Sequence, residues 1–211
     1  MTSAINRIEV AHSSGIARFF LLMVSSIVHS TVTCDAAAAG VDLTATDWVM
    51  TGFETCSGSW SGPLVFETQG PDGDGFALSG HFDWFHDGVN HGRELFSGTL
   101  AADGTVTVFG FKLVCAFGIV LGSYTAELSP EGDALINGVW QPCSGAWSAV
   151  PDSCGIDVLH DGTVGIVDLI LLLGEWGECS EECPCEGDTN GDGFVGIVDF
   201  LAVLGAWGDC P

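Results

Sequence analysis

Basic residues are scarce in this chain. Four Lys and Arg stand against 28 Asp and Glu, which gives a formal net charge of −24 at pH 7. A nucleic acid or an anionic membrane surface would repel such a chain, so the composition excludes nucleic-acid binding. High net charge favours disorder, but hydrophobic residues make up 47% of the chain, and its seven Trp can fill a core. We therefore expect a folded, strongly acidic protein.

Long apolar runs are also missing. The run FFLLMVSSIV has about ten residues, too few to cross a bilayer, which takes about 20. It follows Arg7 and Arg18 and precedes the small residues of CDAAAAG, which is the anatomy of a secretory signal. The sequence therefore predicts a signal peptide over residues 1–39 and a secreted or cell-surface protein without a membrane span. A lipoprotein signal at Cys34 is the alternative, although Thr31–Thr33 is a poor lead-in for one.

Cysteine is well represented, with nine in 211 residues. Cys34 would leave with the signal peptide, and the even number that remains suggests disulfides in an exported chain. Zinc is the competing interpretation, because Cys183 and Cys185 lie close to Cys179. Their spacing, however, matches no common zinc knuckle or ribbon.

An internal repeat occupies the C-terminal end. CGIDVLHDGTVGIVDLILLLGEWGEC (Cys154–Cys179) aligns without a gap with CEGDTNGDGFVGIVDFLAVLGAWGDC (Cys185–Cys210). Each copy reads as a loop followed by one helix. Gly177 and Gly208 stand where helices commonly stop. The apolar residues at helical spacing, which we expect to face the core, are Leu169, Leu172 and Leu173 in the first copy and Phe200, Val203 and Leu204 in the second.

The loop of the second copy has the spacing of a calcium site. Side-chain oxygens stand at positions 1, 3, 5 and 12 of a twelve-residue loop, in Asp188, Asn190, Asp192 and Asp199, with Gly193 at position 6. Calcium prefers six or more oxygen ligands, and the glycine permits the sharp turn that lets neighbouring side chains converge. The sequence therefore predicts bound Ca²⁺.

This tandem of loop–helix units with Asp at position 12 resembles the type I dockerin domain, a divergent relative of the EF-hand. The resemblance covers the repeat and none of the preceding chain. It implies that calcium binds the second loop through Asp188, Asn190, Asp192, the backbone carbonyl of Phe194, and Asp199, and the first through Asp157, Asp161, the carbonyl of Thr163, and Asp168. Leu159 replaces the position-3 ligand in the first loop, so we expect that site to be weaker.

The resemblance also implies a partner, such as a cohesin-like or cell-surface protein. In cellulosomal dockerins the pair before position 12 is usually polar and contacts the cohesin, whereas here the pairs are Ile166–Val167 and Ile197–Val198. We expect these pairs to pack in the core, because so small a unit has little else to bury. A hydrophobic docking face is the alternative.

The repeat predicts its own disulfides. Within one copy, Cys154 and Cys179 flank a helix that separates them by about 15 Å, too far for a disulfide. If the two copies pack head to tail, the start of each copy meets the end of the other. We therefore predict the pairs Cys154–Cys210 and Cys179–Cys185.

The chain from residue 40 to residue 150 has the character of a β domain. Short alternating runs such as PLVFET and TVTVFGF are separated by PDGDG, ADG and SPEGD, which are typical of hairpin turns. About eight strands and no helical window predict an antiparallel barrel or sandwich. With the repeat at 151–211, the fold class is α+β in two parts.

Two segments of the β domain echo each other. CSGSWSG begins at Cys56 and CSGAWSA at Cys143, and closure of a barrel would bring them side by side, so we predict a Cys56–Cys143 disulfide. Cys115 would stay a buried free thiol, or pair with Cys183. The tripeptide Gly58–Trp60 loosely resembles the G-x-W of lipocalin-like barrels.

The segment HFDWFHDGVNHGRE is the densest group of titratable residues in the β domain. Its three His and its Asp83, Asp87 and Glu94 could hold zinc or copper. On a strand, however, His81 and Asp83 share a face while His86 falls on the opposite one, which argues against convergence. Paired carboxylates for glycoside hydrolysis are a further option. We identify no catalytic residue, and no nucleophile motif such as G-x-S-x-G occurs.

Together these features predict an exported, non-enzymatic calcium-binding protein. A β domain of unknown ligand would be joined to a dockerin-like module that stabilises the chain or tethers it to a partner. One alternative is a carbohydrate-active enzyme or polysaccharide-binding protein, because dockerins often accompany such domains. A lipocalin-like carrier, which would require an apolar cavity, is the other.

Overall fold

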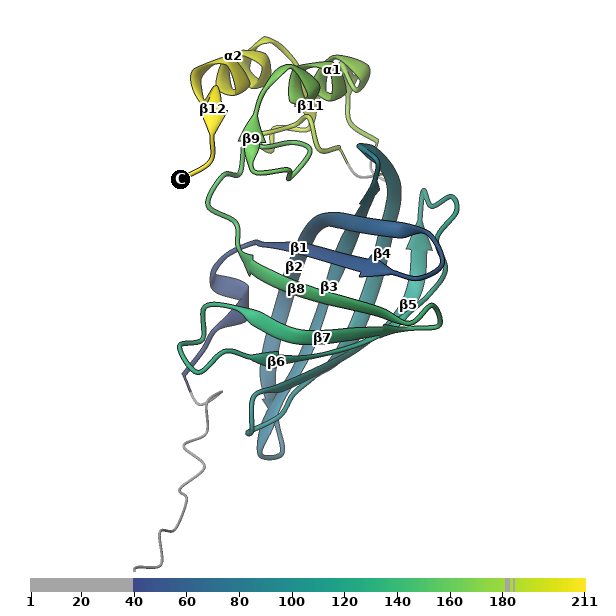
Figure 1. The fold of residues 1–211 in the computed structure, drawn as a ribbon. Coiled ribbons are helices and arrows are strands. Elements are labelled where there is room, and N and C mark those ends of the chain that lie inside the picture. Colours follow the sequence, from purple (N-terminus) through teal and green to yellow (C-terminus); the bar gives the residue numbers. More distant parts are fainter. Residues whose placement is uncertain (1–39, 181–182, 184) are drawn as a thin grey trace, which may run out of the picture. The chain divides into compact units, whose positions relative to one another are not determined.

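The computed structural model describes residues 40–180, 183 and 185–211. The predicted signal peptide and Cys34 lie outside this part of the chain. Eight antiparallel strands form a closed barrel, and two nine-residue helices follow it in the chain (Figure 1). The prediction of a β-rich fold with about eight strands is therefore confirmed, and the barrel is the correct one of the two architectures. No helix within the described ranges is long and apolar enough to cross a bilayer.

The barrel is a meander in which each strand pairs with the next and β8 pairs back with β1. A 3-10 helix at Leu43–Ala45 precedes it. Its strands are β1 (Trp48–Glu54), β2 (Gly58–Asp72), β3 (Gly75–His86), β4 (Val89–Leu100), β5 (Thr105–Val114), β6 (Ser123–Leu128), β7 (Leu135–Gln141) and β8 (Gly145–Pro151).

Closure of the barrel brings the two echoing segments together, as predicted. Gly52 of β1 pairs with Trp60 of β2 on one side and with Trp147 of β8 on the other. Just beyond these strands, Cys56 and Cys143 form a disulfide. Closure leaves the barrel sheet without a free edge, which removes the usual template for strand-by-strand aggregation.

Alternation along the strands fills the barrel interior. In β6, Tyr124, Ala126 and Leu128 are buried, while Thr125 and Glu127 between them are exposed, as the two-residue period of a strand requires. Large side chains from every strand complete one continuous core: Trp48, Leu64, Phe82, Phe96, Val108, Leu135 and Trp147 are among its members.

The C-terminal repeat folds as two interlocked copies. Its elements are β9 (Thr163–Val164), α1 (Ile166–Gly174), β10 (Gly177–Glu178), β11 (Phe194–Val195), α2 (Ile197–Gly205) and β12 (Gly208–Asp209). The short strand in the loop of each copy pairs with the strand at the end of the other, β9 with β12 and β11 with β10. The predicted head-to-tail arrangement is confirmed.

The helices stop earlier than predicted. They end at Gly174 and Gly205, and the glycines expected at their ends, Gly177 and Gly208, instead open β10 and β12. The reason is the strand exchange, because the residues after each helix must be extended to reach the partner loop.

All four disulfides follow pairs that the sequence suggested. Cys154–Cys210 and Cys179–Cys185 join the two copies at their matching ends. Cys115 pairs with Cys183, so the free-thiol prediction is wrong and its alternative is correct. Since these cysteines are oxidised, the zinc interpretation is wrong as well. Four disulfides indicate an oxidising, extracellular type of environment.

Close approach of strands β2 and β3 depends on a glycine. A Cβ placed on Gly80 would lie 1.9 Å from the carbonyl oxygen of Val65 and 2.8 Å from a ring carbon of Phe96, a fully buried residue. A Cβ on Gly70 would meet nothing within 4 Å. The two glycines therefore form a matched pair for testing the packing.

We predict that Gly80→Ala lowers the free energy of unfolding by about 2–3 kcal/mol, because the added methyl group forces backbone and core to shift. Gly70→Ala should change it by less than about 0.5 kcal/mol. Urea unfolding of the oxidised chain, followed by Trp fluorescence, measures both. Equal effects of the two substitutions would contradict this packing.

Candidate functional site

In the second predicted calcium loop, the oxygen-bearing side chains accept hydrogen bonds from backbone N–H groups of the same loop. The Asp188 carboxylate accepts from the backbone N–H of Asp192 at 3.1 Å and of Gly193 at 2.8 Å. Asn190 Oδ1 accepts from the N–H of Asp192 at 2.9 Å, and Asp192 Oδ1 from the N–H of Phe194 at 3.0 Å. Gly193 has φ of +83°, a conformation that glycine adopts without strain.

Asp199, at position 12, connects this loop to helix α2. It lies in the first turn of the helix and is 1% exposed. Its carboxylate accepts from the N–H of Gly196 at 2.9 Å and from the Thr189 hydroxyl at 3.1 Å. Burial acts to raise the pKa of Asp199, but the hydrogen bonds outweigh it and hold the pKa below its ordinary value. The group is therefore a carboxylate, the form that binds a cation.

The first loop repeats this arrangement. Asp157 accepts from the N–H groups of Asp161 and Gly162, and Asp168 accepts from the N–H of Leu159 at 3.0 Å and of Gly165 at 2.7 Å. Burial, together with the negative charges of Asp168 and Asp161, raises the pKa of Asp157 to about 6. The carboxylates thus repel one another, and a cation among them would relieve that repulsion.

Both loops fit calcium by the chemistry of their donors. The side chains present only oxygen, which hard cations prefer. Thr163 and Phe194, whose carbonyls are predicted ligands, are the first residues of β9 and β11. The second loop has every predicted side-chain oxygen, whereas Leu159 supplies none in the first. Within the described ranges, no group of three or more His, Cys, Asp or Glu lies close enough to hold a metal ion as the side chains stand.

The helices turn an apolar face to solvent. Ile166 and Val167 are 60% and 43% exposed, and Ile197 and Val198 are 59% and 58% exposed, so the prediction that these pairs pack in the core is wrong. Leu173 and Leu204 are exposed too. The core of the repeat is instead formed by Val158, Val164, Leu169, Leu172, Val195 and Val203, with partly buried Phe200 and disulfide cysteines packed against it.

The exposed apolar residues occupy the same positions in both copies. We call them the apolar helix faces: Ile166, Val167, Ile170, Leu173 and Trp176 in the first copy, and Ile197, Val198, Leu201, Leu204 and Trp207 in the second. The sequence offered the two Ile–Val pairs as an alternative docking face, but it missed the other members because helical spacing alone does not show which side of a short helix meets the core. The signal that could have found them is the matched Trp that closes each copy.

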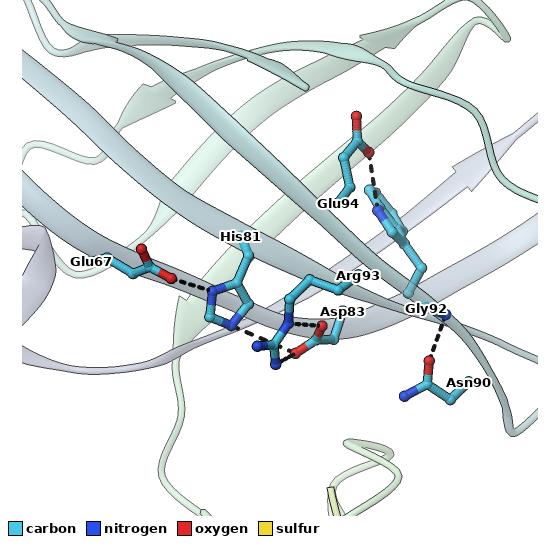
Figure 2. Close-up of polar contacts among 8 residues, drawn as sticks. Glu67, His81, Asp83, Asn90, Gly92, Arg93 and Glu94 are labelled. Atoms are coloured by element: carbon cyan, nitrogen blue, oxygen red, sulfur yellow. Dashed lines mark hydrogen bonds and ion pairs between the residues drawn. The ribbon is translucent and has the colours of Figure 1, made fainter. Parts of the chain in front are cut away.

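The histidine-rich segment forms ion pairs and ring stacks. His81 Nδ1 lies 2.9 Å from Glu67 Oε1, and Arg93 donates two hydrogen bonds of 2.6 Å to Asp83 (Figure 2). His81 and Asp83 share a face, as predicted, with Nε2 and Oδ2 3.6 Å apart. The negative charge of Asp83 is thus balanced by an arginine.

The other two histidines of this segment pack against aromatic rings. His86 stacks on Trp60 with ring centroids 4.8 Å apart, and His91 stacks on Phe117 at 4.5 Å. The residues that the zinc or copper interpretation required therefore serve different contacts.

A cavity of about 260 Å³ opens among the turns at one end of the barrel. Trp60, Trp84, Tyr124 and Trp140 line it together with Glu54 and Glu94. Glu94 is fully buried, and burial raises its pKa above the ordinary value. Figure 2 shows the Glu94 carboxylate directed away from the pair that Asp83 and Arg93 form on the neighbouring strands. The sequence pointed to Glu94 but not to the aromatic residues around it.

Comparison of the chain with protein-family models and with curated proteins finds no match. The function proposed for the chain therefore rests on its calcium loops, its apolar helix faces and its barrel cavity.

We predict that Leu159→Asn tightens calcium binding by the first loop about tenfold, since it restores an oxygen ligand, and that Asn190→Leu weakens the second loop by a similar factor. The substitutions are exchanges between matching positions of the repeat, so each controls for the other. Calorimetric calcium titration of the full oxidised chain measures both. Unchanged binding in both variants would show that position 3 does not contact calcium.

Proposed function

We propose that the chain is an exported, non-enzymatic protein. Its C-terminal repeat would bind calcium and would dock the whole protein onto a partner protein. The observation that carries this proposal is the pair of apolar helix faces. Single exposed hydrophobic residues are common on protein surfaces, but contiguous apolar patches mark interaction sites. Duplication of the same patch in both copies argues for a role beyond chance exposure.

Calcium would fix the helices that present these faces. Asp168 and Asp199 each join a loop to the first turn of a helix through hydrogen bonds. A cation held by those carboxylates would lock the start of α1 and α2 against the loops, and neutralise their charge. Asp188, Asn190, Asp192, the Phe194 carbonyl and Asp199 would hold it in the second loop. Docking should therefore depend on calcium.

The partner would be a protein with an apolar surface, such as a cohesin-like domain or a cell-surface protein. The dockerin resemblance suggests this class, although the exposed β-branched pairs depart from the polar ones of cellulosomal dockerins. A binding surface of this kind would be more hydrophobic than theirs. Secretion is supported by the four disulfides, which require an oxidising environment.

A second candidate function is supported by the barrel cavity, which suits a small ligand. A ligand cavity is what a carrier or a carbohydrate-binding barrel would require. The chemistry of the cavity walls determines which kind of ligand fits. The two candidates are compatible, since one concerns the repeat and the other the barrel.

We predict that the double substitution Ile170→Asp and Leu201→Asp weakens docking more than about tenfold, because each charge would have to be buried in an apolar interface. Both residues are about 60% exposed, at 60% and 58%, so the fold should persist. Surface plasmon resonance of the full chain against a panel of cohesin domains, with calcium and then with EGTA, measures this.

Val139→Asp on the barrel, at a residue 51% exposed, is the control and should leave docking unchanged. Binding that ignores EGTA, or that survives the double substitution, would contradict the proposal. Failure of every cohesin in the panel to bind would exclude this class of partner.

A further inference from the structure

Four aromatic rings that line the barrel cavity pack against one another, Trp84 and Tyr124 stacked at 28° with centroids 5.8 Å apart and the other pairs steeply inclined. Trp84 is perpendicular to Trp60, with an interplanar angle of 89° and ring centroids 6.0 Å apart, and perpendicular to Trp140, at 87° and 5.7 Å. Tyr124 meets Trp140 at 74°. These rings come from four different strands, β2, β3, β6 and β7, so closure of the barrel holds them in place. Because His86 stacks on Trp60, Trp60 offers the cavity one ring face at most.

Two carboxylates belong to the same cavity. Glu54 accepts hydrogen bonds from Trp140 Nε1 at 3.1 Å and from the Ser57 hydroxyl, and it shares the Trp60 N–H, at 3.2 Å, with the Ser57 oxygen at 2.8 Å. Glu94 accepts from the Tyr124 hydroxyl at 2.6 Å, from Trp84 Nε1 at 3.1 Å and from the N–H of Gly122 at 2.7 Å. Each carboxylate therefore has three protein donors.

This hydrogen bonding decides what the walls can offer a ligand. The indole N–H groups and the Tyr124 hydroxyl, which could have donated to a ligand, already donate to Glu54 and Glu94. A carboxylate has about four lone-pair sites, so each retains capacity to accept. Apart from the amide of the exposed Gln141, what remains for a ligand is negative charge, acceptor capacity and the electron-rich surfaces of aromatic rings, all of which attract a cation.

The cavity lining supplies no positive charge to balance these carboxylates. Among the described residues, none of the side chains that line the cavity is a Lys, Arg or His. Burying a carboxylate without a cation is costly, and hydrogen bonds offset only part of that cost. A cationic ligand would supply the missing charge.

We propose that the barrel cavity binds a small organic ammonium ion. The cation would lie in the cavity against the ring surfaces that face it, with Glu54 at the more open side and Glu94 buried behind. A volume of about 260 Å³ lies below the usual range of about 300–1,000 Å³ for ligand pockets, so the ligand is a small one. This proposal does not depend on calcium binding or docking.

The same walls argue against a sugar. Sugars need several donors as well as acceptors around their hydroxyl groups, whereas the indole and phenol donors here are already occupied and the exposed Gln141 adds a single side-chain amide. The carrier of a neutral apolar ligand would leave both carboxylates without a counter-charge.

The test compares choline with 3,3-dimethylbutan-1-ol, its neutral counterpart of the same shape, by calorimetry and Trp fluorescence on the full oxidised chain. We expect choline to bind with a dissociation constant of about 1 mM or tighter, and the neutral alcohol at least about tenfold more weakly. Sodium chloride at equal ionic strength controls for screening of the acidic chain.

Variants locate the site. Glu54→Gln should weaken choline binding about tenfold. Glu127→Gln, which removes the same charge at an exposed position of β6 outside the cavity, should leave binding unchanged. If Glu54→Gln does not fold, the comparison of the two ligands on the unsubstituted chain still decides.

Four outcomes would overturn the proposal. Equal binding of both compounds would mean an apolar carrier site, and binding or hydrolysis of a glucoside in their place would mean a carbohydrate site. No binding of choline or methylammonium at about 10 mM would mean that the cavity is not an ammonium site. Equal weakening by Glu54→Gln and Glu127→Gln would mean that binding reflects overall charge alone.

Discussion

The link between loop carboxylates and helix starts governs the C-terminal repeat. Asp168 and Asp199 sit at the third position of α1 and α2 and accept hydrogen bonds from the loops that precede them. The loops in turn carry the short strands that pair with the other copy. Loop, helix and strand exchange thus depend on a few buried carboxylates, whose repulsion a calcium ion would relieve.

The disulfides constrain the same unit from its ends. Cys154–Cys210 and Cys179–Cys185 close the two copies on each other, where each could contribute a few kcal/mol by restricting the unfolded chain. With the ends fixed and six buried aliphatic residues inside, the outer sides of both helices are left to solvent. The apolar helix faces are therefore a consequence of how small the unit is, as well as a candidate docking surface.

Much of the fold could be predicted from the sequence because its signals are local or duplicated. Alternation of apolar and polar residues predicted the strands, and the similar segments around Cys56 and Cys143 predicted closure of the barrel. The internal repeat predicted its own two disulfides. Helical spacing could not show that Leu173 and Leu204 face solvent while Leu172 faces the core. Each helix is short, and the small repeat covers only one of its sides. The prediction for Cys115 left two options, because which segments meet in space depends on tertiary packing.

The two candidate sites also differ in how far the sequence reveals them. The calcium loops are contiguous, so the spacing from Asp188 to Asp199 is visible in the sequence. The barrel cavity is assembled from strands far apart in the chain, with Glu54 and Trp140 separated by 86 residues. Each of its residues alone reads as an ordinary core or surface position, and only closure of the barrel shows that indole N–H groups and carboxylates pair around a common space.

Calcium titration of the full oxidised chain by calorimetry, with circular dichroism alongside, would show whether the repeat folds around calcium. We predict one tight site, assigned to the second loop by its loss in Asp188→Ala, with a weaker event or none from the first loop, and a gain of helical signal on binding. Absence of binding at about 1 mM calcium, the weak end of extracellular calcium modules, would contradict it. The repeat would then be a unit held by its disulfides and aliphatic core alone.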